Sequence, residues 1–331
     1  MKAKKGGSAQ AIIKALLGNS FVTLFKFVGW MITGSPSMLA EGLHSCADVF
    51  NQSLLFIGIK RSKEVSIDHP WGMGPVQYLF NLLSAVGVFT LGCVVTIWHA
   101  IHDYHNPSPE SKLWWVSLII LAIAFIVEGY TCYVAFKEVY ARKGRKKLSN
   151  FLRQTDDPAL IAILLEDSAA MLGIVIAATG IVTSKLTGSH LPDIISAILI
   201  GLMMGAIAYF LGMLNAKLLI GKSIPVEKEE DYREFITKIK SVEKITDLKT
   251  EVLGPNRVYL SFKAELHTTF IINIEHLHDA AEEIKDGGQP IKILLEASDR
   301  AVRSTAREIA NIEKLIKKEF PEISIIDLEL D

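Results

Sequence analysis

The sequence predicts a six-helix transmembrane bundle followed by a C-terminal α+β domain whose elements run in the order αββαβ. The first observation behind this is composition, because 50% of the 331 residues are hydrophobic and only 21% are charged, against roughly 25% charged in soluble domains. The second is the distribution of charge. Residues 1–221 hold 18 Lys or Arg and 13 Asp or Glu, whereas residues 222–331 hold 17 and 23. We therefore expect a membrane domain over 1–221 and a soluble domain over 222–331.

Six apolar segments are each long enough to cross about 30 Å of hydrocarbon, which takes roughly 20 helical residues. They lie at 11–33, 37–59, 76–100, 114–137, 159–183 and 192–216. An even number of spans places both termini on one side, and loop Lys and Arg residues mark the cytosolic side. These residues gather before the first span, between the second and third, and between the fourth and fifth, whereas the opposite loops hold only Lys112 and Lys185. Both termini are predicted to be cytosolic.

The N-terminus indicates how the first apolar segment is used. A polar, Lys-containing segment of ten residues precedes a long apolar run with no small-residue cleavage site, so we expect a retained first span and not a signal peptide. No leader rich in Arg and Ser precedes it. The sequence therefore favours the inner or plasma membrane of a bacterium over an organelle.

The acidic C-terminal third shows the patterns of a small α+β domain. A helix is expected at 231–239, strands at 245–253 and 258–266 around the turn Gly254-Pro255-Asn256, a long amphipathic helix at 299–318, and a last strand at 323–330. The stretch 267–297, between the second strand and the long helix, is expected to be less regular.

Polar side chains form one stripe on the second span. Glu41, His44, Asp48 and Asn51 are spaced by 3, 4 and 3 residues, which places them within an arc of roughly 80° at about 100° per residue. Ionisable groups inside a membrane are costly, and they face the interior of a bundle. His44 and Asp48 are one turn apart, so both can bind one ion, and imidazole with carboxylate is a common ligand pair for divalent transition metals.

Further carboxylates lie at matching depth on other spans. Asp48 lies about 16 Å from the outer face and Asp167 roughly 20 Å, at ~1.5 Å per residue. Glu128 lies at about 21 Å by the same measure. Glu166 points away from Asp167 by about 100°, so it is either a ligand or the buried partner of a basic group, and Glu128 is either a ligand or a hydrogen-bonding residue. The candidate metal ligands are His44, Asp48, Asp167, Glu166 and Glu128.

The remaining polar residues are expected to be structural or solvated. Lys26 is interpreted as a snorkelling cation and Asn19 as a packing amide. The cysteines lie in apolar stretches without a CxxC, so they predict small buried side chains and no disulfide or thiolate zinc site: Cys46, Cys93 and Cys132. The residues expected at the solvated surface are His102, Asp103, His105, His267, His276 and His278.

Two motifs carry a family resemblance. Ser35–Asp48 reads Ser-Pro-Ser-Met-Leu-Ala-Glu-Gly-Leu-His-Ser-Cys-Ala-Asp, and His69–Gly74 reads His-Pro-Trp-Gly-Met-Gly. Together they resemble the cation diffusion facilitator family. Asn51-Gln52 and the run Glu166-Asp-Ser-Ala-Ala look like the zinc transporter 9 branch. The resemblance implies six spans, a ferredoxin-like cytosolic domain, a homodimer, and proton-coupled antiport of zinc or a similar ion.

The resemblance also implies a ligand set. The family takes two ligands from the second span, here His44 and Asp48, and two from the fifth span, spaced by four residues. Asp167 matches the second of these, whereas Ile163 stands at the first and cannot bind metal. Glu166, Glu128 or water would then supply the fourth position.

The function that these observations predict is a proton-coupled antiporter that exports a divalent transition metal, zinc first, from the cytosol. Protons would compete because His44 must be neutral, and the carboxylates ionised, before metal binds. Its partners are the lipid bilayer and a second copy of the chain, with no nucleic acid and no prosthetic group.

Three alternatives stay open. The first is a transporter of manganese, iron or cobalt. The second is a membrane scaffold or metal-sensing protein without transport. The third is a membrane metalloenzyme, which the lack of a Gly-rich loop opening a helix disfavours, so the chain is predicted not to be an enzyme.

Overall fold

The computed structural model describes residues 7–64, 67–69, 71–107, 112–143, 158–254, 256–272 and 274–331. The chain divides into two compact units, residues 1–220 and 221–331, and each is described by itself.

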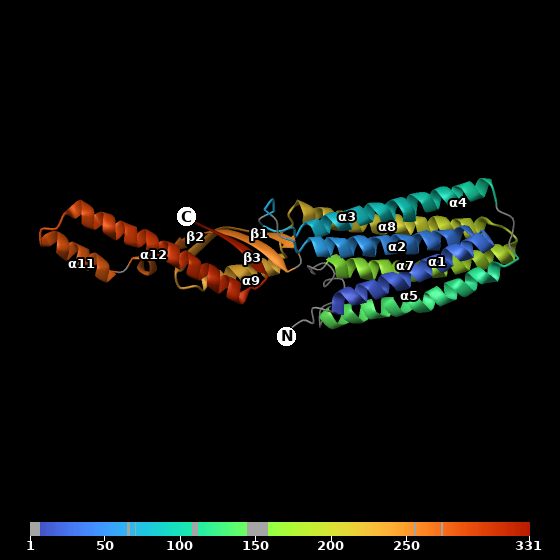
Figure 1. Ribbon diagram of the computed structural model, residues 1–331, viewed down its shortest axis with the longest axis horizontal. Coiled ribbons are helices and arrows are strands. Elements are labelled where there is room, and N and C mark those ends of the chain that lie inside the picture. Colours follow the sequence, from blue (N-terminus) through green and yellow to red (C-terminus); the bar gives the residue numbers. More distant parts are fainter. Residues whose placement is uncertain are drawn as a thin grey trace. The chain divides into compact units, whose positions relative to one another are not determined.

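The first unit is a bundle of long helices that lie side by side (Figure 1). In chain order they are α1 (Gly7–Thr33), α2 (Pro36–Arg61), α3 (Val76–Val88), η1 (Phe89–Val95), α4 (Thr96–His105), α5 (Trp114–Lys143), α7 (Pro158–Thr187) and α8 (Leu191–Ile220). The elements α3, η1 and α4 follow one another without a break, and η1 is a π-helical segment. Helix α2 packs against α1, α3, α7 and α8, so its side chains reach most of the bundle interior.

Four stretches of described residues are long and apolar enough to cross a membrane: Val76–His105, Trp114–Ala141, Ile161–Thr187 and Leu191–Ile220. They correspond to the last four predicted spans, which are confirmed as long apolar helices. Large apolar side chains on the outside of the bundle are exposed, among them Phe21 at 64%, Ile126 at 73% and Tyr209 at 70%, as a lipid-facing surface requires. Helices α1 and α2, which carry Lys26, Glu41, His44 and Asp48, lie outside this set, so the count of six spans stays a prediction.

The connection between α1 and α2 consists of two residues. Gly34 has a φ of +67°, a backbone conformation that glycine adopts without steric cost. Ser35 is the N-cap of α2, where its Oγ accepts a hydrogen bond from the backbone N–H of Met38 at 3.2 Å, and Pro36 follows as the first helical residue, a position that suits proline. This tight turn folds α1 directly onto α2, so residues at similar distances from the turn face each other.

The second unit is a three-stranded mixed sheet with helices. In chain order its elements are α9 (Val226–Thr237), β1 (Val242–Gly254), β2 (Arg257–Leu266), α10 (Thr268–Ile271), α11 (Ile274–Lys285), α12 (Pro290–Glu319) and β3 (Ile323–Leu330). The central strand β2 pairs antiparallel with β1 and parallel with β3. Its core contains fully buried side chains of α9, β2 and α12: Tyr232, Ile236, Leu260, Phe262, Ile312 and Ile316.

One expectation for this unit is wrong. The stretch 267–297 was expected to be less regular than its neighbours, yet it contains α10, α11 and the first turns of α12. Gly287, with a φ of +93°, and Pro290 separate α11 from α12. Their apolar side chains are mostly exposed, with Ala280 and Ile293 as the buried ones of α11 and of the first half of α12. A hydrophobic face this small gives a weak periodic signal.

Candidate metal site

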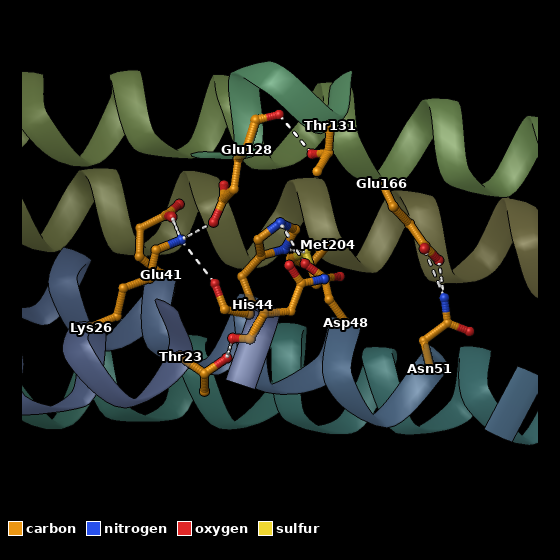
Figure 2. A network of polar contacts seen from close by, with 12 residues as sticks. Thr23, Lys26, Glu41, His44, Asp48, Asn51, Glu128, Thr131, Glu166 and Met204 are labelled. Atoms are coloured by element: carbon orange, nitrogen blue, oxygen red, sulfur yellow. Dashed lines mark hydrogen bonds and ion pairs between the residues drawn. The ribbon is translucent and has the colours of Figure 1, made fainter. Parts of the chain in front are cut away.

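His44 and Asp48 meet in the middle of α2. His44 is 1% exposed, and its Nε2 lies 3.5 Å from Oδ2 of Asp48. Figure 2 shows both side chains projecting to the same side of the helix, as their one-turn spacing predicts. The pair supplies one nitrogen and one carboxylate at neighbouring positions.

The other ring nitrogen of His44 is in contact with a residue that sequence reasoning missed. Nδ1 contacts the thioether sulfur of Met204 on α8 (Figure 2). Among the described residues Nε2 has no hydrogen-bond partner, so it is the nitrogen left to bind a ligand on the side of Asp48. Met204 is 1% exposed, and η1 packs against it so closely that a Cβ at Gly92 would lie 2.7 Å from its Cε. A methionine in an apolar span carries no signal that distinguishes it from packing residues.

A cavity of about 570 Å³ opens beside this pair, between α1, α2, α3, α5, α7 and α8. Five carboxylates border it: Asp48, Glu128, Glu138, Glu166 and Asp167. No Lys, Arg or His is among the described residues that line it. Ile163, at the position that lacks a ligand, also borders the cavity. The structure thus gathers the four candidate carboxylates around one acidic space, with His44 next to it.

Glu166 is held by an amide. Nδ2 of Asn51 donates to both carboxylate oxygens of Glu166, at 2.6 and 2.7 Å. Oδ1 of Asn51 in turn accepts from the hydroxyl of Ser84 on α3 at 2.6 Å. Asn51, the last member of the α2 stripe, therefore joins α2 to α3 and α7.

The interpretation of Lys26 as a snorkelling cation is wrong. Lys26 is 0% exposed, and its Nζ donates to Glu41, Ser45 and Glu128, each at 2.8 Å. The tight turn between α1 and α2 explains the difference, because it places Lys26 against Glu41 in the middle of the bundle, too deep for the side chain to reach an interface. Glu128 reaches the same ammonium from α5 (Figure 2).

The predicted ligands are gathered around one cavity, but they do not converge on one point. No three His, Cys, Asp or Glu side chains within the described residues come close enough together to hold a metal ion. His44 and Asp48 are in contact, Glu128 binds Lys26, and Glu166 binds Asn51. The ligand roles of His44, Asp48, Asp167, Glu166 and Glu128 therefore stay predictions.

The outcomes for the remaining polar residues differ. Asp103 was expected to be solvated, yet it is 7% exposed, because α4 packs against α8 and α2. Its Oδ2 lies 3.0 Å from Nδ1 of His99, one turn earlier. The three cysteines are free, and Cys93 is buried whereas Cys46 and Cys132 are half-buried. Asn19 borders the cavity. The histidines expected at the surface are exposed: His102, His105, His267, His276 and His278.

Comparison with known proteins places the bundle in a family. A model of the cation efflux transmembrane domain matches residues 12–220. The chain belongs to the cation efflux family. The resemblance that the motifs of α2 and the following loop indicated, including the zinc transporter 9 branch, is confirmed.

Three relatives show what this family contains. The mouse protein named proton-coupled zinc antiporter SLC30A9, mitochondrial, is 32% identical over 337 residues, which cover 98% of this chain and 59% of the mouse protein. Metal tolerance protein C4 of Arabidopsis thaliana is 28% identical over 340 residues, covering 97% of this chain and 73% of that protein. The manganese efflux system protein MneP of Bacillus subtilis is 24% identical over 291 residues, covering 84% and 90%. The chain thus spans about three fifths of the length of the mouse SLC30A9 protein.

Proposed function

We propose that this protein of the cation efflux family is an antiporter that exports a divalent transition metal, zinc first, in exchange for protons. The observation that supports this most is the acidic cavity, because five carboxylates border a space with no described basic residue in its lining. Carboxylates inside a bundle are costly unless a cation neutralises them. A cavity built this way favours the entry of a cation.

The His44–Asp48 pair is where we expect the ion to bind. Zinc takes four light ligands, so Asp167 and one of Glu128, Glu166 or water would have to approach the pair. The ligands would converge when an ion loads and disperse when it leaves, because free carboxylates repel one another when no cation lies between them. Protons compete for the same atoms, because imidazole and carboxylate bind either a proton or the metal.

Within this function, the main alternative to zinc as the transported ion is manganese. The mouse relative is named as a zinc antiporter and the Bacillus relative as a manganese efflux protein. In the candidate set one imidazole nitrogen stands beside four carboxylates. Imidazole favours zinc, whereas carboxylate oxygens favour harder cations such as manganese. The His44 nitrogen is the feature on which the choice of zinc rests.

We also propose that all six long helices of the first unit span the membrane, with both termini in the cytosol. The support is the excess of Lys and Arg in alternate loops and the side-by-side packing of α1 and α2 with the four apolar spans (Figure 1). The mouse relative is named as mitochondrial and another relative is from Bacillus subtilis, so the relatives favour neither an organelle nor a bacterial membrane.

A homodimer is the assembly that we propose, with α12 as a contact surface. Ile291, Leu295, Ser298 and Val302 are spaced by 4, 3 and 4 residues, the heptad spacing of a coiled-coil seam. Ile291, Leu295 and Val302 are 76%, 65% and 68% exposed. An antiparallel pairing of two copies would place Ile291 opposite the partner's Val302. The same alignment brings Lys292 near Asp299 of the partner subunit, so opposite charges flank the apolar contact.

The test of the function is metal-driven proton flux in proteoliposomes that contain the purified chain. A zinc gradient should drive protons in the opposite direction in the wild type. Asp48→Asn should abolish this flux, because it removes one charged ligand with little change of volume. Glu138→Gln is the matched control, since Glu138 borders the same cavity but is outside the proposed ligand set.

The alternatives give different results in the same vesicles. Flux with manganese but not with zinc would assign the chain to the manganese type. Zinc binding without any flux would point to the scaffold or sensor. If Asp48→Asn transports as well as the wild type, the proposed site is wrong.

A further inference from the structure

Three oxygens converge on the ammonium of Lys26. Oε2 of Glu41, Oε1 of Glu128 and Oγ of Ser45 each lie 2.8 Å from Nζ. Lys26 comes from α1, Glu41 and Ser45 from α2, and Glu128 from α5, so three helices meet at one buried cation. Lys26 and Glu41 are 0% exposed, and the Glu128 side chain is 12% exposed.

The oxygens around this ammonium exceed what it can satisfy. A lysine ammonium has three donors, and its three contacts use all of them. Glu41 Oε1 and Glu128 Oε2 are buried without a hydrogen-bond partner among the described residues. The cluster thus sets two carboxyl groups against one ammonium and leaves two oxygen atoms unused, so it offers more oxygen ligands than an ammonium can satisfy.

The carboxylate of Glu41 is held in place by α7. A side chain at Gly173 would collide with Oε1 of Glu41, so the backbone of α7 packs directly on this carboxylate. Ser45 lies one turn further along α2, which the short α1–α2 connection fixes against α1. The oxygens on α2 are thus positioned by packing as well as by their contact with Lys26.

We propose that Glu41, Glu128 and Ser45 form a second cation site, which Lys26 fills with its own ammonium in place of a divalent ion. All three residues offer oxygen, which suits hard cations such as manganese or magnesium. In the wild-type chain the ammonium keeps a second divalent ion out of this position. It also holds one oxygen of Glu128, a residue that lines the cavity. Lys26 thereby limits the acidic interior to ions that bind near His44 and Asp48.

This inference does not depend on transport. It is tested by comparing the number of divalent ions bound by a Lys26 variant with the number bound by the wild-type chain. Failure of the proposed antiport would leave the count unaffected, and failure of the second site would leave zinc flux through the His44–Asp48 pair unaffected.

The test is manganese binding to the full-length chain in detergent, measured by equilibrium dialysis with electron paramagnetic resonance and by the Tm with and without Mn²⁺. Lys26→Met removes the ammonium and keeps a long side chain, so it should bind one more Mn²⁺ per chain than the wild type. Mn²⁺ should also raise its Tm more than that of the wild type. Lys26→Arg keeps a cation in place and should gain no ion.

A matched control locates the extra ion. Lys26→Met combined with Glu41→Gln removes a carboxylate of the cluster together with the ammonium, leaves Glu128 unchanged, and should bind no extra Mn²⁺. An extra ion in that double variant would place it elsewhere and overturn the proposal. An unchanged count in Lys26→Met would overturn it as well.

Folding of the single variant is informative too. Lys26→Met leaves two buried carboxylates without a cation, which destabilises the bundle. If this variant folds only when Mn²⁺ is present, the divalent ion replaces the ammonium, as proposed. If no Mn²⁺ concentration restores its fold, the cluster does not bind a divalent ion and the proposal fails.

Discussion

The contact between His44 and Met204 predicts a change in metal affinity without a change in stability. Met204→Leu removes the thioether sulfur that Nδ1 of His44 contacts and keeps an apolar side chain of similar volume. Such a swap in a packed interior costs less than about 1.5 kcal/mol. Loss of the group that orients a metal-binding imidazole lowers affinity by roughly 10- to 100-fold. A thioether is a weak acceptor, so we expect the lower end, about 10-fold or ~1.4 kcal/mol.

The assay is a zinc titration of the purified chain against a fluorescent chelator, with a thermal melt of the same sample. Met203→Leu is the matched control, because it makes the same exchange one residue earlier on α8, about 100° around the helix from Met204. The expected result is a zinc Kd raised about 10-fold in Met204→Leu alone, with similar Tm values in both variants. An equal Kd in the two variants would refute the argument that Met204 orients the ring.

The remaining predictions concern the cavity and the second unit. Asp167→Asn should abolish zinc-driven proton flux in proteoliposomes, and flux at the wild-type rate would remove Asp167 from the ligand set. His44→Asp should keep transport but favour manganese over zinc, since it exchanges the one nitrogen for oxygen; an unchanged preference in competition flux would contradict this. Ile163→His adds an imidazole at the cavity wall and should lower the zinc Kd, unless a carboxylate or water already fills the fourth position. Val302→Glu should shift the full chain from dimer to monomer in light scattering, whereas Ala310→Glu, exposed on the same helix, should not; an unshifted Val302→Glu would rule out the α12 seam.

Local periodicity was sufficient for the features that lie within one helix. The pairing of His44 with Asp48 follows from a spacing of one turn, and the structure has them 3.5 Å apart. The last four spans follow from runs of apolar residues. The strands of the second unit were also found, with β1 beginning three residues before the predicted start at residue 245.

Contacts between helices were beyond the reach of the sequence. Lys26 is an exposed cation or the centre of a buried cluster depending on which helices pack against α1, and no pattern within α1 distinguishes the two. The sequence around Met204 also gives no indication of its contact with His44, because the two residues lie 160 positions apart. Asp103 was misplaced since its burial depends on how the end of α4 packs. Depth along the spans was enough to place the carboxylates of α2, α5 and α7 near one another. It did not show which of these side chains are in direct contact.

The two-residue turn at Gly34 and Ser35 restricts how the bundle can rearrange. Helices α1 and α2 form a hairpin, because two residues connect them and Lys26 of α1 donates hydrogen bonds to Glu41 and Ser45 of α2. We therefore expect the two helices to move together as one rigid unit. The contact with Glu128 is different, because it joins the hairpin to α5. A movement of the hairpin relative to α5 would therefore break the Lys26–Glu128 contact and leave the Lys26–Glu41 contact intact.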